Sequence, residues 1–201
     1  KGVIICSNLR EAEAALLKIM HDRSFGNAGN RVVIEECLNG QEVSFLAFTD
    51  GKTISSMPAV CDYKRIYDGD NGPNTGGMGA YSPPPFFTHN LASQIESPVM
   101  YPIIRALNSE GISYRGIIYA GLMLTQEGPK VLEFNTRFGD PETQVILPQL
   151  KTDLAEIFIG VINGTLEKCA IEWARSHCVN VVMASAGYPE AYNKGFSIKG
   201  L

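Results

Sequence analysis

Apolar positions along the chain recur at two spacings, which predicts both strands and helices. Alternating or β-branched runs predict strands at residues 3–6, 32–38, 42–49, 53–57, 116–124, 130–134 and 179–184. Helical spacing predicts helices at residues 8–19 and 90–109, a third from Pro141 to about Leu150, and a fourth from Asp153 to Asn163. Because hairpins join several of these strands, the pattern predicts an α+β fold with antiparallel sheets and flanking helices.

Turn residues mark where the predicted strands connect. Asp50-Gly51 is a strong hairpin signal, and a second turn around Gly128 joins strands 116–124 and 130–134. Residues 69–85 are so rich in Gly, Pro and Asn that they predict an ordered loop without regular structure. We find no internal repeat and no low-complexity tract.

Composition narrows the class of protein. Of the 201 residues 45% are hydrophobic and 19% charged, as in ordinary globular proteins, and no apolar run approaches the roughly 20 residues that cross a membrane. A formal net charge of -4 without a basic cluster argues against nucleic acid. Five widely spaced cysteines without a C-x-x-C pair predict reduced thiols and a cytosolic location. The start on Lys1-Gly2, directly before an apolar run, predicts a piece of a longer chain.

The most informative polar residues lie on and just after the strand at 130–134. Residues two apart on a strand share a face, so Glu133 and Asn135 present two hard oxygen ligands suited to Mg²⁺. For that pair alone, polar residues on an edge strand are the better interpretation. Arg137, Asp140 and Glu142 follow at a Gly-Asp-Pro break where a helix is predicted, and this context favours a phosphoryl-transfer site.

Three other stretches carry weaker signals. The glycines at 72–81 would let backbone N–H groups approach phosphate, although the stretch lacks the Walker and dinucleotide spacings and a structural turn is the alternative. Lys64 and Arg65 could hold an anion, with a solvated charge pair as the alternative. The extended stretch at 33–42 could offer its backbone to adenine and a carboxylate to ribose, while Lys1 would supply charge to the phosphates.

Taken in this order, these stretches resemble the ATP-grasp superfamily. The motifs at 72–81 and 137–142 resemble the signature of the glycinamide ribonucleotide synthetases, and the resemblance runs over essentially the whole chain. It implies a ligase that forms a C–N bond and uses ATP, Mg²⁺ or Mn²⁺, glycine and 5-phosphoribosylamine. The implied products are glycinamide ribonucleotide, ADP and phosphate, formed through glycyl phosphate in purine (IMP) biosynthesis.

The resemblance also implies roles for particular residues. Those implied for ATP are Lys1, Glu35, Glu36, Leu38, Glu42, Lys64 and Arg65, with Glu133 and Asn135 as metal ligands. Those implied for the substrates are Asn74, Thr75, Gly76, Gly77, Met78, Gly79, Pro141 and Glu142, with Arg137 and Asp140 as catalytic residues that contact substrate or acyl phosphate. The sequence departs from the family pattern at Cys61, Tyr63 and Thr136, and strand 116–124 lacks the carboxylate that many relatives use as a further metal ligand.

The implied domain organisation is partial. Residues 1–34 would be the remainder of the ATP-grasp lid, 35–174 the main subdomain and 175–201 the start of a C-terminal subdomain, so the chain by itself should be inactive. The sequence leaves open whether the parent protein is monofunctional or fused to other purine-pathway domains. The alternatives are an ATP-grasp ligase with another carboxylate substrate and a nucleotide-binding module without catalysis.

Overall fold

The computed structural model describes residues 2–69 and 71–200, and the chain divides into two compact units that meet in sequence at Asn39 and Gly40. The first unit contains α1 (Leu9–Leu16), η1 (Leu17–His21) and η2 (Gly26–Asn30). Asn8 caps α1 by accepting a hydrogen bond from the Glu11 N–H at 3.0 Å. The stretches 3–6 and 32–38 have no regular structure, in contrast to the predicted strands, because no neighbouring strand in the described residues pairs with them.

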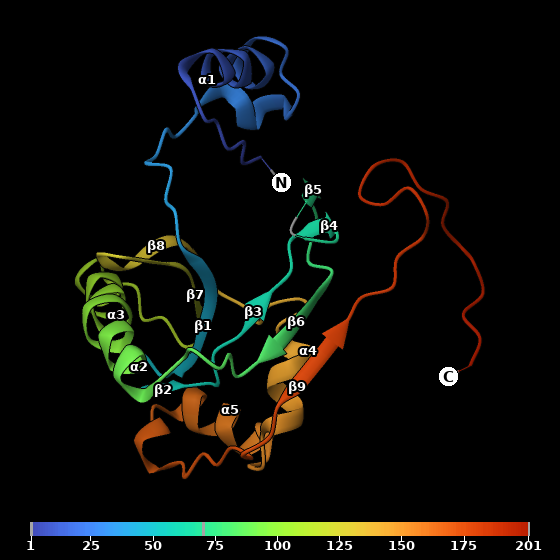
Figure 1. The fold of residues 1–201 in the computed structure, drawn as a ribbon. Coiled ribbons are helices and arrows are strands. Elements are labelled where there is room, and N and C mark those ends of the chain that lie inside the picture. Colours follow the sequence, from blue (N-terminus) through green and yellow to red (C-terminus); the bar gives the residue numbers. More distant parts are fainter. Residues whose placement is uncertain (1, 70, 201) are drawn as a thin grey trace. The chain divides into compact units, whose positions relative to one another are not determined.

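The second unit is built on a four-stranded antiparallel sheet (Figure 1). Its order is β2 (Ile54–Ser56), β1 (Gln41–Thr49), β7 (Gly116–Thr125) and β8 (Gly128–Asn135). Both predicted hairpins are confirmed, since β1 pairs with β2 and β7 pairs with β8. Strand β1 also pairs along its whole length with β7, which brings residues about 75 positions apart in sequence side by side.

Helices cover the two faces of this sheet. On one face, α2 (His89–Ile95), η3 (Glu96–Met100) and α3 (Tyr101–Ser109) pack against alternate residues of β1 and β7 (Figure 1). The predicted helix at 90–109 thus has a wide turn at its centre, where Pro98 and Pro102 donate no backbone hydrogen bond. The other face packs against α4 (Thr143–Ile146), η4 (Leu147–Gln149), α5 (Leu154–Asn163) and η5 (Leu166–Lys168).

Residues 69–85, predicted as a loop without regular structure, contribute one strand to each of two small sheets. One contains β3 (Cys61–Asp62), β6 (Gly79–Ser82) and β9 (Cys178–Val181), and the other pairs β4 (Arg65–Tyr67) with β5 (Asn71–Asn74). A Cβ on Gly79 would lie 2.5 Å from the carbonyl oxygen of Asn180. Glycine therefore permits close strand pairing at this position, although glycine-rich composition predicted a loop.

A buried carboxylate fixes the turn after β1. Asp50 is 2% exposed, and its carboxylate accepts hydrogen bonds from the N–H groups of Thr53 at 2.8 Å, Lys52 at 3.2 Å and Leu166 at 3.2 Å. Burial by itself would raise the pKa of the Asp50 carboxyl. The three N–H donors outweigh burial and hold that pKa below its ordinary value.

We expect this carboxylate to make the stability of the protein pH-dependent. Because its pKa is lower in the folded state, the contribution of ionised Asp50 is present above its unfolded pKa of about 3.9 and is lost as the pH falls through the folded pKa. Asp50→Asn should lower the free energy of unfolding by about 1–3 kcal/mol at pH 7, and the difference should shrink below about pH 4. Urea unfolding between pH 7 and pH 2.5 measures this difference in the free energy of unfolding, with the exposed Glu110→Gln variant as the control. A difference that is constant across this range would contradict the assignment.

Candidate active site

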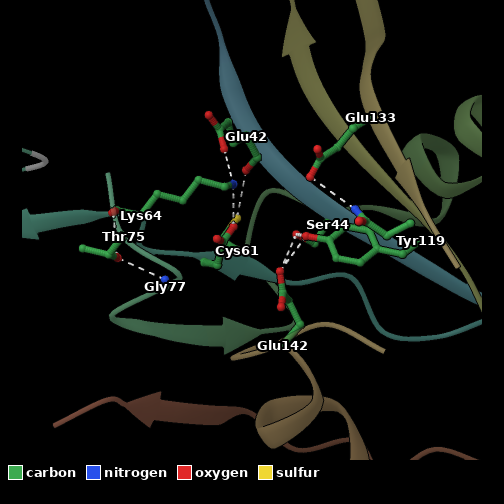
Figure 2. Close-up of polar contacts among 11 residues, drawn as sticks. Glu42, Ser44, Cys61, Lys64, Thr75, Gly77, Tyr119, Glu133 and Glu142 are labelled. Carbon is green, nitrogen blue, oxygen red and sulfur yellow. Dashed lines mark hydrogen bonds and ion pairs between the residues drawn. The ribbon is translucent and has the colours of Figure 1, made fainter. Parts of the chain in front are cut away.

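A row of residues crosses three neighbouring strands of the four-stranded sheet. Ser44 on β1 is the register partner of Gly121 on β7, which is the partner of Glu133 on β8. Tyr119 and Asn135 form the neighbouring pair on the same face. Figure 2 shows the Ser44, Tyr119 and Glu133 side chains gathered at this part of the sheet. The absence of a side chain on Gly121 leaves room beside Glu133, whose Cγ would lie 3.4 Å from a Cβ at that position.

A bulge in β8 sets the direction of Glu133. The register shifts between Gly121 and Leu122, so that Val131 pairs with Leu122 and Leu132 is the extra residue. The Asn135 Nδ2 donates to the Glu133 Oε1 at 3.2 Å, which confirms that these two side chains lie together. The apolar residues Leu132 and Phe134 of β8 are each 38% exposed, because β8 is an edge strand.

The Glu133 and Asn135 pair fits a magnesium ion that the protein would hold together with phosphate and water. Within residues 2–69 and 71–200 no group of three or more His, Cys, Asp or Glu side chains could enclose a metal. Mg²⁺ in phosphoryl-transfer sites usually takes one or two protein oxygens and completes its shell with phosphate and water. Two adjacent oxygen donors on an exposed strand edge match that pattern and do not match a closed structural metal site.

A buried carboxylate lies beneath this row (Figure 2). Glu142 is 3% exposed, and its Oε1 accepts hydrogen bonds from the Tyr119 hydroxyl at 2.6 Å and the Ser44 hydroxyl at 3.3 Å. Ser44 and Tyr119 also contact each other at 2.7 Å. Burial and the negative charge of Glu142 both raise the pKa of Tyr119, which stays a neutral donor at physiological pH. The Glu142 Oε2 has no hydrogen-bond partner among the described residues.

The helix predicted from Pro141 is shorter than expected. Helix α4 begins at Thr143 and has four residues, because Pro148 follows closely and the chain continues as the single turn η4. Such a short helix has only a small dipole, so its N-terminus by itself attracts an anion weakly. The Asp140–Pro141 peptide bond is cis.

Lys64 is a partly buried, ion-paired residue and not the solvated charge that was the alternative to an anion site. Its ammonium forms ion pairs with Asp62 at 3.0 Å and with Glu42, and its side chain is 27% exposed (Figure 2). Burial by itself would lower the pKa of Lys64, but the two carboxylates outweigh it and raise that pKa above the ordinary value. Lys64 therefore stays positively charged. Arg65 donates to the Gly72 carbonyl at 2.7 Å and so holds the glycine-rich stretch.

The glycine-rich stretch is fixed by its own backbone contacts. The Thr75 N–H and hydroxyl both donate to the Lys64 carbonyl, at 2.7 and 2.9 Å, and the Gly77 N–H donates to the Thr75 hydroxyl at 3.0 Å. Gly77 has φ +129°, and a Cβ there would lie 2.3 Å from the Pro141 Cδ. The two motifs singled out in the sequence therefore contact each other at Gly77 and Pro141.

The structure brings most of the remaining predicted residues to the same region. Arg137 is exposed and donates to the Phe138 carbonyl at 2.8 Å, while the Asp140 carboxylate accepts from Gln144 at 2.6 Å. Asn74 pairs with Arg65 between β4 and β5. The predicted substrate residues Met78 and Gly79 are tied to Tyr63, since the Met78 N–H donates to the Tyr63 carbonyl and the Tyr63 N–H donates to the Gly79 carbonyl.

The predicted adenine-binding residues lie in the other unit. Glu35, Glu36 and Leu38 belong to its stretch without regular structure, and Lys1 lies outside the described residues. Their assignment to ATP stays a prediction. Ser44 and Tyr119 are site residues that the sequence motifs do not include. Each bears a hydroxyl in an otherwise apolar part of a strand, which is a usable signal for a buried polar contact.

Comparison with known protein families supports the motif analysis. Residues 1–143 match the model of the phosphoribosylglycinamide synthetase ATP-grasp (A) domain. The chain belongs to this family.

Curated relatives of two kinds match the whole chain. It is 56% identical over 202 residues to the trifunctional purine biosynthetic protein adenosine-3 of Gallus gallus and covers 20% of that protein. It is 50% identical over 201 residues to the phosphoribosylamine–glycine ligase of Caldanaerobacter subterraneus subsp. tengcongensis and covers 48% of it. This member of the phosphoribosylglycinamide synthetase family therefore spans about half the length of that ligase and a fifth of that trifunctional protein.

Solved structures agree with the family assignment. The phosphoribosylamine–glycine ligase of Thermotoga maritima superposes with a TM-score of 0.68 at 39% identity, over 80% of this chain and 40% of that one. A biotin carboxylase domain from Hydrogenobacter thermophilus superposes with a TM-score of 0.62 at 14% identity over 89% of this chain and 38% of that one, which shows the shared ATP-grasp fold. No helix in the described part of the chain is long and apolar enough to cross a membrane.

Proposed function

We propose that the parent of this chain ligates glycine to 5-phosphoribosylamine at the expense of ATP, in purine (IMP) biosynthesis. The glycine carboxylate attacks the γ-phosphorus of ATP, which gives glycyl phosphate and ADP. The amine of phosphoribosylamine then attacks the glycyl carbonyl, and phosphate leaves to give glycinamide ribonucleotide. The family membership and the relatives named phosphoribosylamine–glycine ligase support this proposal.

One observation in the structure carries the proposal: the glycine-rich stretch packs against the Gly-Asp-Pro break through Gly77 and Pro141. Glu142 follows Pro141 directly and accepts a hydrogen bond from Tyr119, which is the cross-strand partner of Asn135. The oxygen donors and the glycine-rich backbone therefore lie in one unit, and the exposed Arg137 follows Asn135 by two residues in the same unit. This is the set of groups that phosphoryl transfer to a carboxylate needs.

Each group has a role in this mechanism. Glu133 and Asn135 would hold Mg²⁺ or Mn²⁺, which when bound neutralises phosphate charge. Arg137 supplies an exposed guanidinium that can neutralise the charge of the acyl phosphate. The proposed mechanism uses no protein nucleophile. His21, His89 and His177 lie outside the contacts described for the site.

The first experiment is phosphate release by the full-length parent protein with ATP, Mg²⁺, glycine and freshly generated phosphoribosylamine, omitting each component in turn. We expect release only when all four are present. Release without phosphoribosylamine would indicate an ATP-grasp ligase with another acceptor. No release at all would favour the binding-module alternative.

Three further features stay predictions. We expect the 201-residue chain alone to be inactive, because it spans about half of its ligase relatives. Vertebrate relatives with the name trifunctional purine biosynthetic protein support fusion of the parent to other purine-pathway domains. A cytosolic location is consistent with five cysteines that form no disulfide.

A further inference from the structure

The buried carboxylate of Glu142 takes no part in the proposed chemical steps. Glu142 is 3% exposed, which removes its side chain from solvent and from a molecule bound at the surface. Burying a carboxylate costs free energy unless hydrogen bonds compensate for the lost water. Among the described residues its carboxylate accepts from two hydroxyls, those of Tyr119 at 2.6 Å and Ser44 at 3.3 Å (Figure 2). A group with this cost points to a role that an apolar residue could not fill.

The Gly-Asp-Pro break is shaped to admit this carboxylate. A Cβ on Gly139 would lie 2.2 Å from the Glu142 Oε2 and 2.6 Å from its Cδ, far inside van der Waals contact. The backbone of Gly139 is not in the left-handed region, so conformational freedom does not explain a glycine at this position. The structure needs a glycine here because the Glu142 carboxylate occupies the space of a side chain.

The carboxylate joins the residue before α4 to two strands of the large sheet. Ser44 lies on β1 and Tyr119 on β7, and their hydroxyls contact each other at 2.7 Å. The two hydroxyls carry two protons, which suffice for one bond between them and one bond to the Glu142 Oε1. All three side chains belong to buried residues, so water does not compete for these bonds and they hold one geometry.

The two strand residues lie beside the predicted metal ligands. Tyr119 is the cross-strand partner of Asn135, and Ser44 lies in the same row as Gly121 and Glu133. Cross-strand partners share a face, with Cβ atoms about 4.5–5.5 Å apart. In the described part of the chain, β8 pairs with β7 alone. A displacement of Tyr119 therefore reaches Asn135 and, through their hydrogen bond at 3.2 Å, Glu133 as well.

We propose that Glu142 is a positioning residue that acts through the hydroxyls of Tyr119 and Ser44. It fixes the strands that carry the two oxygen donors, Glu133 and Asn135, relative to the Gly-Asp-Pro break, and it contacts neither substrate nor metal. The inference rests on the proposed function and adds to it the group that holds the metal ligands in place. Two other roles predict different results: contact with a substrate, and a hydrogen bond that only stabilises the fold.

The test compares two tyrosine hydroxyls in the full-length parent. Tyr119→Phe removes the bond to Glu142. The matched control is Tyr114→Phe, which removes a partly buried bond to the Ile117 carbonyl from a residue that packs on the opposite face of the sheet. Two quantities are measured: the Mg²⁺ concentration that half-activates the ligase, and the Kd of Mn²⁺ for the ADP-bound parent, followed by electron paramagnetic resonance.

The two phenylalanine variants should differ in metal affinity and agree in stability. Loss of a group that orients metal ligands typically costs 10- to 100-fold in metal affinity, so we expect both quantities to rise about 10-fold or more in Tyr119→Phe. Both should stay within about 2-fold in Tyr114→Phe, because its hydroxyl is remote from the row. The Tm should fall in both variants, since each loses one hydrogen bond of a neutral donor.

Substitutions at Glu142 separate positioning from substrate contact. Glu142→Gln keeps an oxygen that can accept from both hydroxyls, whereas Glu142→Ala removes it. The Mn²⁺ Kd should therefore stay within about 3-fold in Glu142→Gln and rise about 10-fold or more in Glu142→Ala. The KM values for glycine and phosphoribosylamine should stay within about 2-fold in Glu142→Gln, because a positioning residue makes no contact with either substrate.

Two results would overturn the inference. Equal Mn²⁺ affinities in Tyr119→Phe and Tyr114→Phe would show that the network only stabilises the fold. A rise confined to the KM of one substrate in Glu142→Gln would assign Glu142 to substrate contact. The tyrosine comparison decides the question even where Glu142→Ala fails to fold. Mn²⁺ binding is measured without glycine or phosphoribosylamine, so it tests the inference even if the unmodified parent lacks four-component dependence and the proposed function fails.

Discussion

Replacing Glu133 by alanine in the full-length parent should lower glycine-dependent ADP formation by about 10³-fold. Glu133 is one of two adjacent oxygen donors on an exposed strand edge, and removal of one preorganised electrostatic group at the reacting phosphate typically costs 10²- to 10³-fold in rate. Because the described residues contain no group of three or more His, Cys, Asp or Glu side chains that could hold the metal instead, we expect the loss at the upper end of that range. The measurement is ADP formation at saturating ATP and glycine.

The matched control for this variant is Glu127→Ala. Glu127 belongs to the turn between β7 and β8 and forms an exposed ion pair with Lys130 at 2.9 Å, so its removal changes charge without touching the row on the sheet. Both variants should unfold within a few degrees of the parent protein, because both side chains are exposed. Near-normal turnover of Glu133→Ala would contradict the proposal that Glu133 is a metal ligand.

Gly77→Ala should reduce both stability and turnover. The residue has φ +129°, a conformation that costs a residue with a side chain about 1–3 kcal/mol, and its new Cβ would lie 2.3 Å from the Pro141 ring. The glycine-rich stretch must therefore move away from the Gly-Asp-Pro break. Since a displacement of about 1 Å at a reacting centre can cost 10²-fold, we expect turnover to fall by about 10²-fold and unfolding free energy by at least 2 kcal/mol, as estimated from the strain and overpacking.

Gly128→Ala separates backbone strain from the clash. Gly128 has a similar φ of +113°, but a Cβ there would meet no atom within 4 Å. This variant should lose about 1–3 kcal/mol of stability from strain alone and keep its turnover within about 3-fold. Equal loss of turnover in the two alanine variants would show that the contact between Gly77 and Pro141 does not contribute to activity.

Local patterns in the sequence determined the strands and hairpins of the large sheet and the pairing of Glu133 with Asn135 on one face. Side chains two residues apart on a strand share a face, and Asp50-Gly51 and Gly128 supply turns that few other residues allow. These features depend on neighbours in the chain, so periodicity alone predicts them. The sequence also indicated both motifs of the site, because each contains residue types with specific chemical roles.

Contacts between distant residues were decided by the tertiary structure alone. The hydroxyls of Ser44 and Tyr119 gain their role when Glu142 becomes their acceptor, 98 and 23 residues away in sequence. Lys64 became an ion-paired residue because Glu42 and Asp62 lie beside it. The glycine-rich stretch acquired strands because β9 pairs with β6. Burial and strand pairing depend on which surfaces meet, and a local pattern contains no information about a partner about a hundred residues away.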